Sequence, residues 1–360
     1  MTLAAWFHTL SPFAVRFGPD LGIRWYGLAY LAGFAVAYFA MRAMSRRALI
    51  AIPYDRVGDA LLWLIGGALI GGRIGYALFY DPRLLYTFSD HFPFWSLLAI
   101  NEGGMASHGG IAGTIIAAWR ISRGFRDSTG AIVGRTSFMH VCDAMALVAP
   151  AGLMFGRLAN FVNGELLGKI VAKPGEASPW WAVQYPQEID LCATDRLGNT
   201  SPGPDLVQTP EQWQKILDLA RPLAPDNTIE GLRVGVHRLA HEGWKHVEQL
   251  RPLISARHPS QLYQGAAEGL ILGAVLWIVW AKPRKPGVIG AIFLIAYGIL
   301  RILTELIRLP DAQLAVRRIL GLSRGQWLSV AMIAVGLWVL VYATRRAAPK
   351  MGGWLRPART

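Results

Sequence analysis

Seven long apolar blocks constrain the fold of this chain more than any other feature of its sequence. A helix needs about 20 apolar residues to cross the hydrocarbon core of a bilayer, which is roughly 30 Å thick. The blocks lie near residues 26–43, 60–80, 108–120, 138–163, 262–280, 287–307 and 325–344. We therefore predict an all-α, multi-pass integral membrane protein with seven transmembrane helices, of which the third is short and has the least defined ends.

One long polar stretch, residues 170–258, interrupts the apolar blocks. It contains prolines and charges of both signs, so we expect a single extramembrane insert. The chain then divides into residues 1–169 with spans one to four, the insert, and residues 259–360 with spans five to seven and a basic tail. Residues 1–19 lack the pattern of a signal peptide, so the first span is expected to direct insertion. Cys142 and Cys192 lie at different depths and are not expected to form a disulfide.

The formal net charge of +13 is distributed as in a membrane protein, not as in a nucleic-acid-binding protein. Basic residues follow every second span: Arg42, Arg46, Arg47 and Arg56; Arg120, Arg123, Arg126 and Arg135; Lys282, Arg284 and Lys285; and Arg345, Arg346, Lys350, Arg356 and Arg359. This positive-inside pattern places the N-terminus and the insert in the periplasm and the C-terminus in the cytoplasm. Arg317, Arg318 and Arg324, between spans six and seven, run against it.

Glycines occur in two runs inside the spans, GGALIGG at 66–72 and HGGIAG at 108–113. Glycine lets the backbones of two membrane helices approach closely, so these runs predict tight helix packing.

Charged side chains inside the spans need a different explanation, because each costs roughly 2.5–3.5 kcal/mol near the centre of a membrane helix. Arg73, Arg157, Arg301 and Glu305 all lie in the outer halves of spans two, four and six, which run in the same direction. Helical spacing places Arg301, Glu305 and Arg308 on one face. These side chains are therefore expected to meet in one cavity that faces outward. Alternatively, Arg301 and Glu305 neutralise each other, and Arg157 extends to the headgroups.

Several guanidinium groups at headgroup depth suit a lipid that carries a phosphate, since arginine binds phosphate through two parallel hydrogen bonds. His108, in GGMASHGG, begins span three and is a candidate proton acceptor, although a histidine at a helix start is more often a packing residue. Tyr26, in RWYGLAY, begins span one at the same depth, where tyrosines usually act as interfacial anchors.

The stretch GRLANFVNGELLG, residues 156–168, resembles the signature of the bacterial prolipoprotein diacylglyceryl transferases at every defined position. The resemblance extends in order through RWYGLAY (24–30), GGRIGYALFY (71–80), GGMASHGG (103–110), RHPSQLYQ (257–264) and LRILTELIRLPDAQ (300–313). The insert from about 190 to 250 matches no pattern of that family.

This resemblance implies an enzyme of the bacterial inner membrane with its active site toward the periplasm. Such an enzyme moves the diacylglyceryl group of phosphatidylglycerol onto the lipobox cysteine thiol of a preprolipoprotein, which forms a thioether and releases glycerol 1-phosphate. Nothing in the sequence demands a metal or an organic cofactor.

The resemblance also implies roles for individual residues. Arg157 and Arg301 correspond to the pair that holds the phosphate, with Asn160, Glu165 and Glu305 organising the headgroup or the arginines. Tyr26, His108 and Gly168 match positions on which the family depends. Asn163 belongs to the same signature, and Arg73 and Arg308 match supporting arginines. We expect Arg157, Arg301, His108 and Tyr26 to be catalytic and the remainder to bind substrate, although the cationic field could suffice without His108 as a base.

Two rival sites remain open at the level of sequence. HRLAHEGWKH, in the insert, contains His237, His241, Glu242 and His246, and histidines at i and i+4 have a metal-ligand spacing. An exposed amphipathic helix explains them more simply. His140 and Asp143, in span four, fit a structural hydrogen bond better than a proton relay.

A secondary transporter or lipid flippase is the alternative function, since intramembrane arginines and broken helices also mark transport pathways. A transporter would carry its polar groups near the midplane of two inverted halves. Here the polar groups gather toward the outer ends and the halves show no evident symmetry, so the sequence favours the enzyme.

Overall fold

The computed structural model describes residues 5–18, 21–90, 92–100, 103–190, 207–309 and 321–355. Five residues named above lie outside the described residues: Cys192, Arg317, Arg318, Arg356 and Arg359. The side chain of Arg324 is also outside the description.

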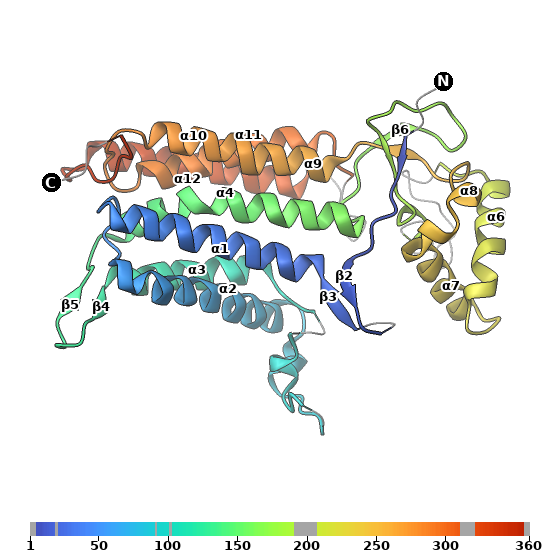
Figure 1. Ribbon diagram of the computed structural model, residues 1–360, viewed down its shortest axis with the longest axis horizontal. Coiled ribbons are helices and arrows are strands. Elements are labelled where there is room, and N and C mark those ends of the chain that lie inside the picture. The colour runs from blue at the N-terminus through green and yellow to red at the C-terminus, as the bar shows by residue number, and fades with distance from the viewer. Residues whose placement is uncertain are drawn as a thin grey trace. The chain divides into compact units, whose positions relative to one another are not determined.

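The apolar blocks form helices whose bounds lie close to those expected (Figure 1). These are α1 (Trp25–Arg46), α2 (Val57–Phe79), α3 (Ser107–Ser122), α4 (Phe138–Asn163), α9 (Ser260–Gly265), α10 (Leu272–Val279), α11 (Val288–Glu305) and α12 (Arg324–Arg345). A π-helical segment, Ala266–Ile271, joins α9 and α10 into one continuous element.

Six of the elements are long and apolar enough to cross a membrane, which supports a helical membrane protein. The exception among the expected spans is α3, which has 16 residues and falls short of the usual length. The count of seven spans therefore stays a prediction.

The chain divides into two compact units, which we describe separately. Unit one comprises Met1–Gly33, Pro150–Leu272 and Ala296–Ile333, and unit two comprises Phe34–Ala149, Gly273–Ile295 and Ala334–Thr360. The boundaries fall inside α1, α4, α10, α11 and α12, so each of these helices contributes one part to each unit. The division expected from the sequence, at residues 169 and 258, stays a prediction.

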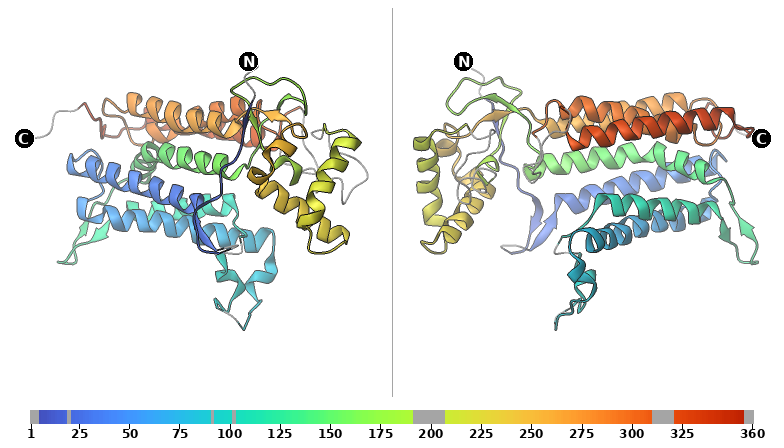
Figure 2. Two further views of the ribbon diagram at one scale, coloured as in Figure 1. Left: turned by 45° about the vertical axis from the view of Figure 1, so that its right-hand side comes forward. Right: turned by 180° about the vertical axis from the view of Figure 1, so that it is seen from behind.

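In unit two, α2 and α3 lie side by side and touch along their glycines (Figures 1 and 2). A Cβ added to Gly71 would come within 2.4 Å of the carbonyl oxygen of Gly109, and one on Gly113 within 2.0 Å of that of Gly67. The backbones are thus too close for any side chain, which confirms the packing role predicted for the glycine runs.

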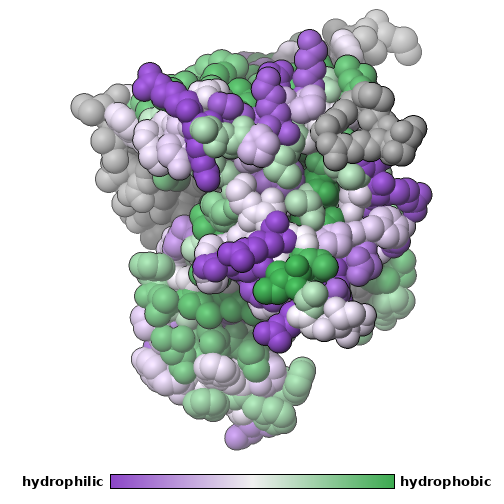
Figure 3. All heavy atoms as spheres, turned by 90° about the vertical axis from the view of Figure 1, so that its left-hand side faces the viewer, coloured by the Kyte–Doolittle hydropathy of each residue, from purple (hydrophilic) through white to green (hydrophobic). Residues whose placement is uncertain are grey.

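The basic loops of unit two lie at one end of its helices. Arg47 donates to the carbonyl of Trp354, Lys285 donates to those of Thr344 and Arg346, and Arg56 donates to that of Arg126. A short hairpin, β4 (Phe125–Arg126) and β5 (Ile132–Val133), extends from α3 here. Figure 3 shows hydrophilic side chains spread over this end.

Unit one contains strands that the apolar pattern did not predict. A four-stranded sheet has the order β1 (Trp6–Phe7), β7 (Val183–Gln184), β8 (Ala256–Arg257) and β6 (Ile170–Ala172), with β1 parallel to β7 and the other pairs antiparallel. A separate hairpin, β2 (Phe13–Arg16) and β3 (Gly22–Arg24), leads into α1.

The described residues of 170–258 form part of unit one and, together with Phe7, bury an apolar core. Helices α6 (Pro210–Ala220), α7 (Ile229–His241) and α8 (Val247–Leu250) bury one face each, and Thr209 begins α6 with a capping box. The core comprises Phe7, Ile189, Trp213, Ile216, Ala220, Val236, Leu239, Ala240, Leu250, Leu253 and Ile254. The amphipathic helix expected for HRLAHEGWKH is therefore confirmed for the residues within α7.

Candidate active site

Arg157 and Arg301 meet at one buried carboxylate in unit one, that of Glu268. Arg157 Nε donates to Glu268 Oε2 over 3.0 Å, and Arg301 Nη1 lies 3.7 Å from Glu268 Oε1. The Glu268 side chain has no exposed surface, whereas the two arginines remain 15% and 16% exposed. A buried carboxylate would cost several kcal/mol without cationic partners, so the three groups stabilise one another.

A second carboxylate, Glu305, extends this cluster along α11. Its Oε2 lies 3.6 Å from Arg301 Nη2 and 3.6 Å from Arg308 Nη1, so the three side chains meet as predicted, although α11 ends at Glu305 and Arg308 lies beyond the helix. Among the described residues, three guanidinium groups thus face two carboxylates. Arg301 Nη1 is buried and makes no hydrogen bond within the described part of the chain. The cluster can therefore accept an anion.

Tyr26, Asn160 and Asn163 converge on Glu165 at the end of α4. Asn160 Nδ2 donates to Glu165 Oε2 over 3.0 Å and also to the Tyr26 hydroxyl, and Asn163 Nδ2 donates to Glu165 Oε1 over 3.2 Å. Asn160 is buried and Glu165 is exposed, so the carboxylate has room to contact a ligand.

The signature segment leaves the helix in a turn with positive φ at Gly164 and Leu166, and it packs closely at Gly168. Gly164 has a φ of +66°, and a Cβ on Gly168 would come within 2.2 Å of the His258 carbonyl oxygen. The Gly168 carbonyl accepts from Arg257 Nη1, and Gly168 pairs with Arg308 in an isolated bridge. Gly168 thus acts through close backbone packing, which joins the signature to the end of α11.

Arg73 lies in unit two, where its guanidinium is buried among backbone carbonyls. It donates to the carbonyls of Ser96, Leu97, Ala99, Gly103 and Gly104, which engages all five N–H groups. In this arrangement Arg73 holds the loop before α3. Its expected role in substrate binding stays a prediction.

His108 also lies in unit two, in the first turn of α3. It is exposed, and its ring packs edge-on against Phe79 with centroids 5.1 Å apart. This is the packing role expected of a histidine at a helix start, and the surface of the ring remains accessible.

His140 and Asp143 each make structural hydrogen bonds, though not to each other. Asp143 accepts from the backbone N–H groups of Gly287 and Gly290, both over 2.7 Å, and so caps the start of α11. His140 Nε2 accepts from the N–H of Ala51 over 3.1 Å. The structural role predicted for His140 and Asp143 was correct, but the predicted hydrogen bond between them was wrong.

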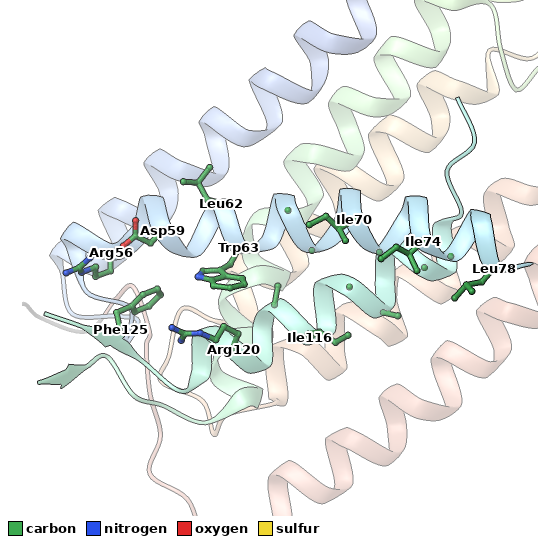
Figure 4. Close-up of a pocket in the computed structure, with 18 of the residues that line it drawn as sticks. Arg56, Asp59, Leu62, Trp63, Ile70, Ile74, Leu78, Ile116, Arg120 and Phe125 are labelled. Carbon is green, nitrogen blue, oxygen red and sulfur yellow. Dashed lines mark hydrogen bonds and ion pairs between the residues drawn. The ribbon is translucent and has the colours of Figure 1, made fainter. Parts of the chain in front are cut away.

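A groove of about 880 Å³ lies in unit two, along α2 and α3 (Figure 4). Glycines and apolar side chains such as Ile70, Ile74 and Ile116 line most of it, and Arg56 and Arg120 lie at one end. None of the arginines that meet at Glu268 and Glu305 lines this groove.

Sequence reasoning missed Glu268, the residue on which the arginines converge. The sequence feature that could have identified Glu268 is that it is the single carboxylate in an apolar run of span five, AAEGLILGAV. An isolated charge in such a run requires a partner, and the nearest candidates are intramembrane arginines on other spans.

Comparison with known proteins shows the family of the chain. The family described as "Prolipoprotein diacylglyceryl transferase" matches residues 12–342. The chain belongs to the prolipoprotein diacylglyceryl transferase family. A relative from Bdellovibrio bacteriovorus, named phosphatidylglycerol–prolipoprotein diacylglyceryl transferase, is 38% identical over 97% of both chains.

Two further diacylglyceryl transferases with the same printed name support this membership. The protein from Cupriavidus metallidurans is 35% identical over 93% of this chain and 94% of its own. The protein from Neisseria gonorrhoeae strain NCCP11945 is 34% identical over 92% and 94%. The resemblance seen in the sequence motifs is thereby confirmed, and a transport function is not favoured.

Proposed function

We propose that the chain transfers the sn-1,2-diacylglyceryl group of phosphatidylglycerol to the lipobox cysteine thiol of a preprolipoprotein. A thioether forms and glycerol 1-phosphate leaves, as the first step of lipoprotein maturation. Membership of the family supports this assignment of the reaction, and the names of the relatives mention both phosphatidylglycerol and prolipoprotein. The observation that best supports the proposed active site is that Arg157 and Arg301 both contact Glu268.

The cluster would act on the phosphate of the lipid. A C–S bond forms at the glycerol carbon while the C–O bond to phosphate breaks, so negative charge accumulates on the leaving phosphate monoester. Guanidinium groups directed at this charge stabilise the transition state more than the ground state. The surface that Arg157 and Arg301 keep exposed, and the Nη1 of Arg301, which makes no hydrogen bond within the described residues, support such a role.

The thiol requires activation, because with an ordinary pKa of about 8.5 only a few per cent is thiolate at neutral pH. His108 is the proposed acceptor of its proton, and the accessible ring supports this. The polar group of Tyr26, Asn160, Asn163 and Glu165 would bind the glycerol hydroxyls of the headgroup, since hydroxyls pair well with carboxylate and amide groups.

We further propose seven spans in the inner membrane, with the insert and the active site on the periplasmic side. The basic helix ends of unit two support this orientation, since positive residues mark the cytoplasmic side. Arg157 and Arg301 lie near the C-terminal ends of α4 and α11, whereas the basic loops precede the N-terminal ends of these helices. This supports a periplasmic depth for the site.

The test measures glycerol phosphate released from phosphatidylglycerol and a lipobox peptide by the purified protein in mixed micelles. We expect Arg157→Ala and Arg301→Ala each to lower kcat/KM by about 10²- to 10³-fold, as for removal of a group that stabilises developing charge. Arg233→Ala, which removes a partly exposed arginine paired with Glu230 on α7, is the matched control and should retain full activity.

A peptide with serine in place of the lipobox cysteine should give no product, because an alcohol is not ionised under these conditions. Full activity of both Arg157→Ala and Arg301→Ala would refute the mechanism.

A further inference from the structure

Three potential metal ligands from two segments meet on the surface of unit one, in the insert. His237 and His241 lie one turn apart on α7, and Asp190 lies in the segment that follows β7. His237 Nδ1 lies 3.0 Å from Asp190 Oδ2, and His241 Nε2 lies 3.9 Å from the same oxygen. One ligand atom from each residue falls within 4.8 Å of the others.

The apolar core fixes the backbone beneath all three side chains. Ile189 precedes Asp190, Val236 precedes His237 and Ala240 precedes His241, and these three neighbours are almost wholly buried in one core cluster. The ligand side chains therefore project from a supported surface. Such support is what distinguishes a built site from a chance meeting of mobile side chains.

The distances suit a tetrahedral ion. Nitrogen and oxygen ligands bind Zn²⁺ at about 2.0–2.1 Å, so adjacent ligands in a tetrahedron lie about 3.3 Å apart. The two separations from Asp190 bracket this value, and small rotations of the side chains would equalise them. The imidazole rings lie with centroids 4.3 Å apart, close enough for one ion to bridge them.

We propose that Asp190, His237 and His241 bind a divalent transition-metal ion such as Zn²⁺, with water in the fourth position. Imidazole and carboxylate ligands suit this class of ion, whereas Ca²⁺ and Mg²⁺ prefer sites made of oxygen alone. All three side chains are partly exposed, so the ion has a direct path to the site. The bound ion would join α7 to the segment after β7, and the proposal is independent of the transferase chemistry.

The other two residues of the same motif do not belong to the cluster. Glu242 forms an ion pair with Lys245, and His246 Nδ1 lies 3.0 Å from Gln249 Oε1. His246 therefore provides a matched control, being a partly exposed histidine of the same insert that is held by a different partner.

The experiment uses the full-length protein, purified in detergent through a tag free of histidine and stripped with a chelator. Zn²⁺ binding is measured by competition with a chromophoric chelator, and Co²⁺ is then added as a spectroscopic probe. We expect one Zn²⁺ per chain, a Co²⁺ spectrum typical of four ligands, and a higher unfolding midpoint with Zn²⁺. His241→Ala and Asp190→Asn should each weaken binding at least tenfold.

His246→Ala should bind Zn²⁺ as the parent protein does. The proposal is overturned if the parent protein binds no Zn²⁺, or if His246→Ala loses as much affinity as His241→Ala. It is also overturned if all variants bind with equal weak affinity, which would indicate adsorption to the surface only. Because the stoichiometry and the Co²⁺ spectrum are measured on the parent protein, a misfolded variant leaves the proposal testable.

Discussion

At the scale of single residues, Glu268 decides how the arginines of unit one are arranged. It contacts both Arg157 and Arg301, and it is the member of the cluster with no exposed surface. Without it, two guanidinium groups would face each other with no shared counterion. The position of the proposed phosphate site therefore depends on a carboxylate that need not touch the substrate.

This dependence gives the first prediction. Glu268→Gln keeps the shape of the side chain but removes its charge, so Arg157 and Arg301 should separate and kcat/KM should fall at least tenfold, about 1.4 kcal/mol. The measurement is the rate of glycerol phosphate release. Glu230→Gln, at an exposed carboxylate paired with Arg233, is the control and should leave the rate unchanged. A fully active Glu268→Gln protein would contradict the arrangement.

Arg73 gives a prediction of the opposite kind, about stability. Arg73→Gln removes most of five hydrogen bonds to buried carbonyls, so we expect the unfolding free energy to fall by about 3 kcal/mol. Thermal unfolding in detergent measures the loss. Arg83→Gln removes an exposed arginine paired with Asp81 and should change stability by less than about 0.5 kcal/mol. Equal midpoints for the two variants would argue against the structural role.

At the scale of elements, the contact between α2 and α3 depends on the absence of side chains. Gly71→Ala should destabilise the protein by about 1–3 kcal/mol, because its Cβ would enter the backbone of α3. Gly66 lies on the same helix with nothing within 4 Å of its Cβ position, so Gly66→Ala should be neutral or slightly stabilising. Thermal unfolding distinguishes them, and a tolerated Gly71→Ala would show that the helices can part at low cost.

The sheet of unit one should make stability depend on pH through His8, which follows β1. Its Nε2 lies 2.8 Å from the Phe161 carbonyl oxygen, and burial lowers the pKa of His8 below its ordinary value of 6.5. Below about pH 6.5 the unfolded chain binds a proton at His8 that the folded chain does not, so the unfolding free energy falls as pH falls.

We expect the unfolding midpoint to drop between about pH 7.5 and 5.5, and to drop less in His8→Gln. The remaining titratable groups are common to both proteins, so the difference between the two curves reports His8 alone. Parallel curves would contradict this assignment.

The sequence predicted some elements well and others not at all, for physical reasons. Apolar runs of about 20 residues have few alternatives to a membrane helix, so the bounds of α4 and α11 were close to correct. Helical spacing also placed Arg301 and Glu305 together, whereas Arg308 reaches Glu305 from beyond the end of α11. Strands of two to four residues are too short to show an alternating pattern, so the sheet was missed. The contact of Glu268 with Arg157 depends on how two separate helices face each other, which periodicity does not determine.

At the scale of the whole molecule, the proposed orientation can be tested with cysteine labelling. In a background with Cys142 and Cys192 replaced by alanine, an impermeant maleimide applied to spheroplasts should label Lys215→Cys but not Ser128→Cys. Lys215 is exposed in the insert, and Ser128 is exposed in the basic β4–β5 hairpin. Both sites should react after the membrane is opened. The reverse pattern in intact spheroplasts would invert the topology.

The parallel pairing of β1 with β7 has a consequence for biosynthesis. Trp6 pairs with Val183, so β1 has no partner strand until a segment that follows four apolar helices has been synthesised. At about 5–20 residues per second, this interval lasts roughly ten to forty seconds. During that time the edge of β1 is open to other extended chains, so a nascent protein stalled before β7 should be a preferred substrate for chaperones and proteases.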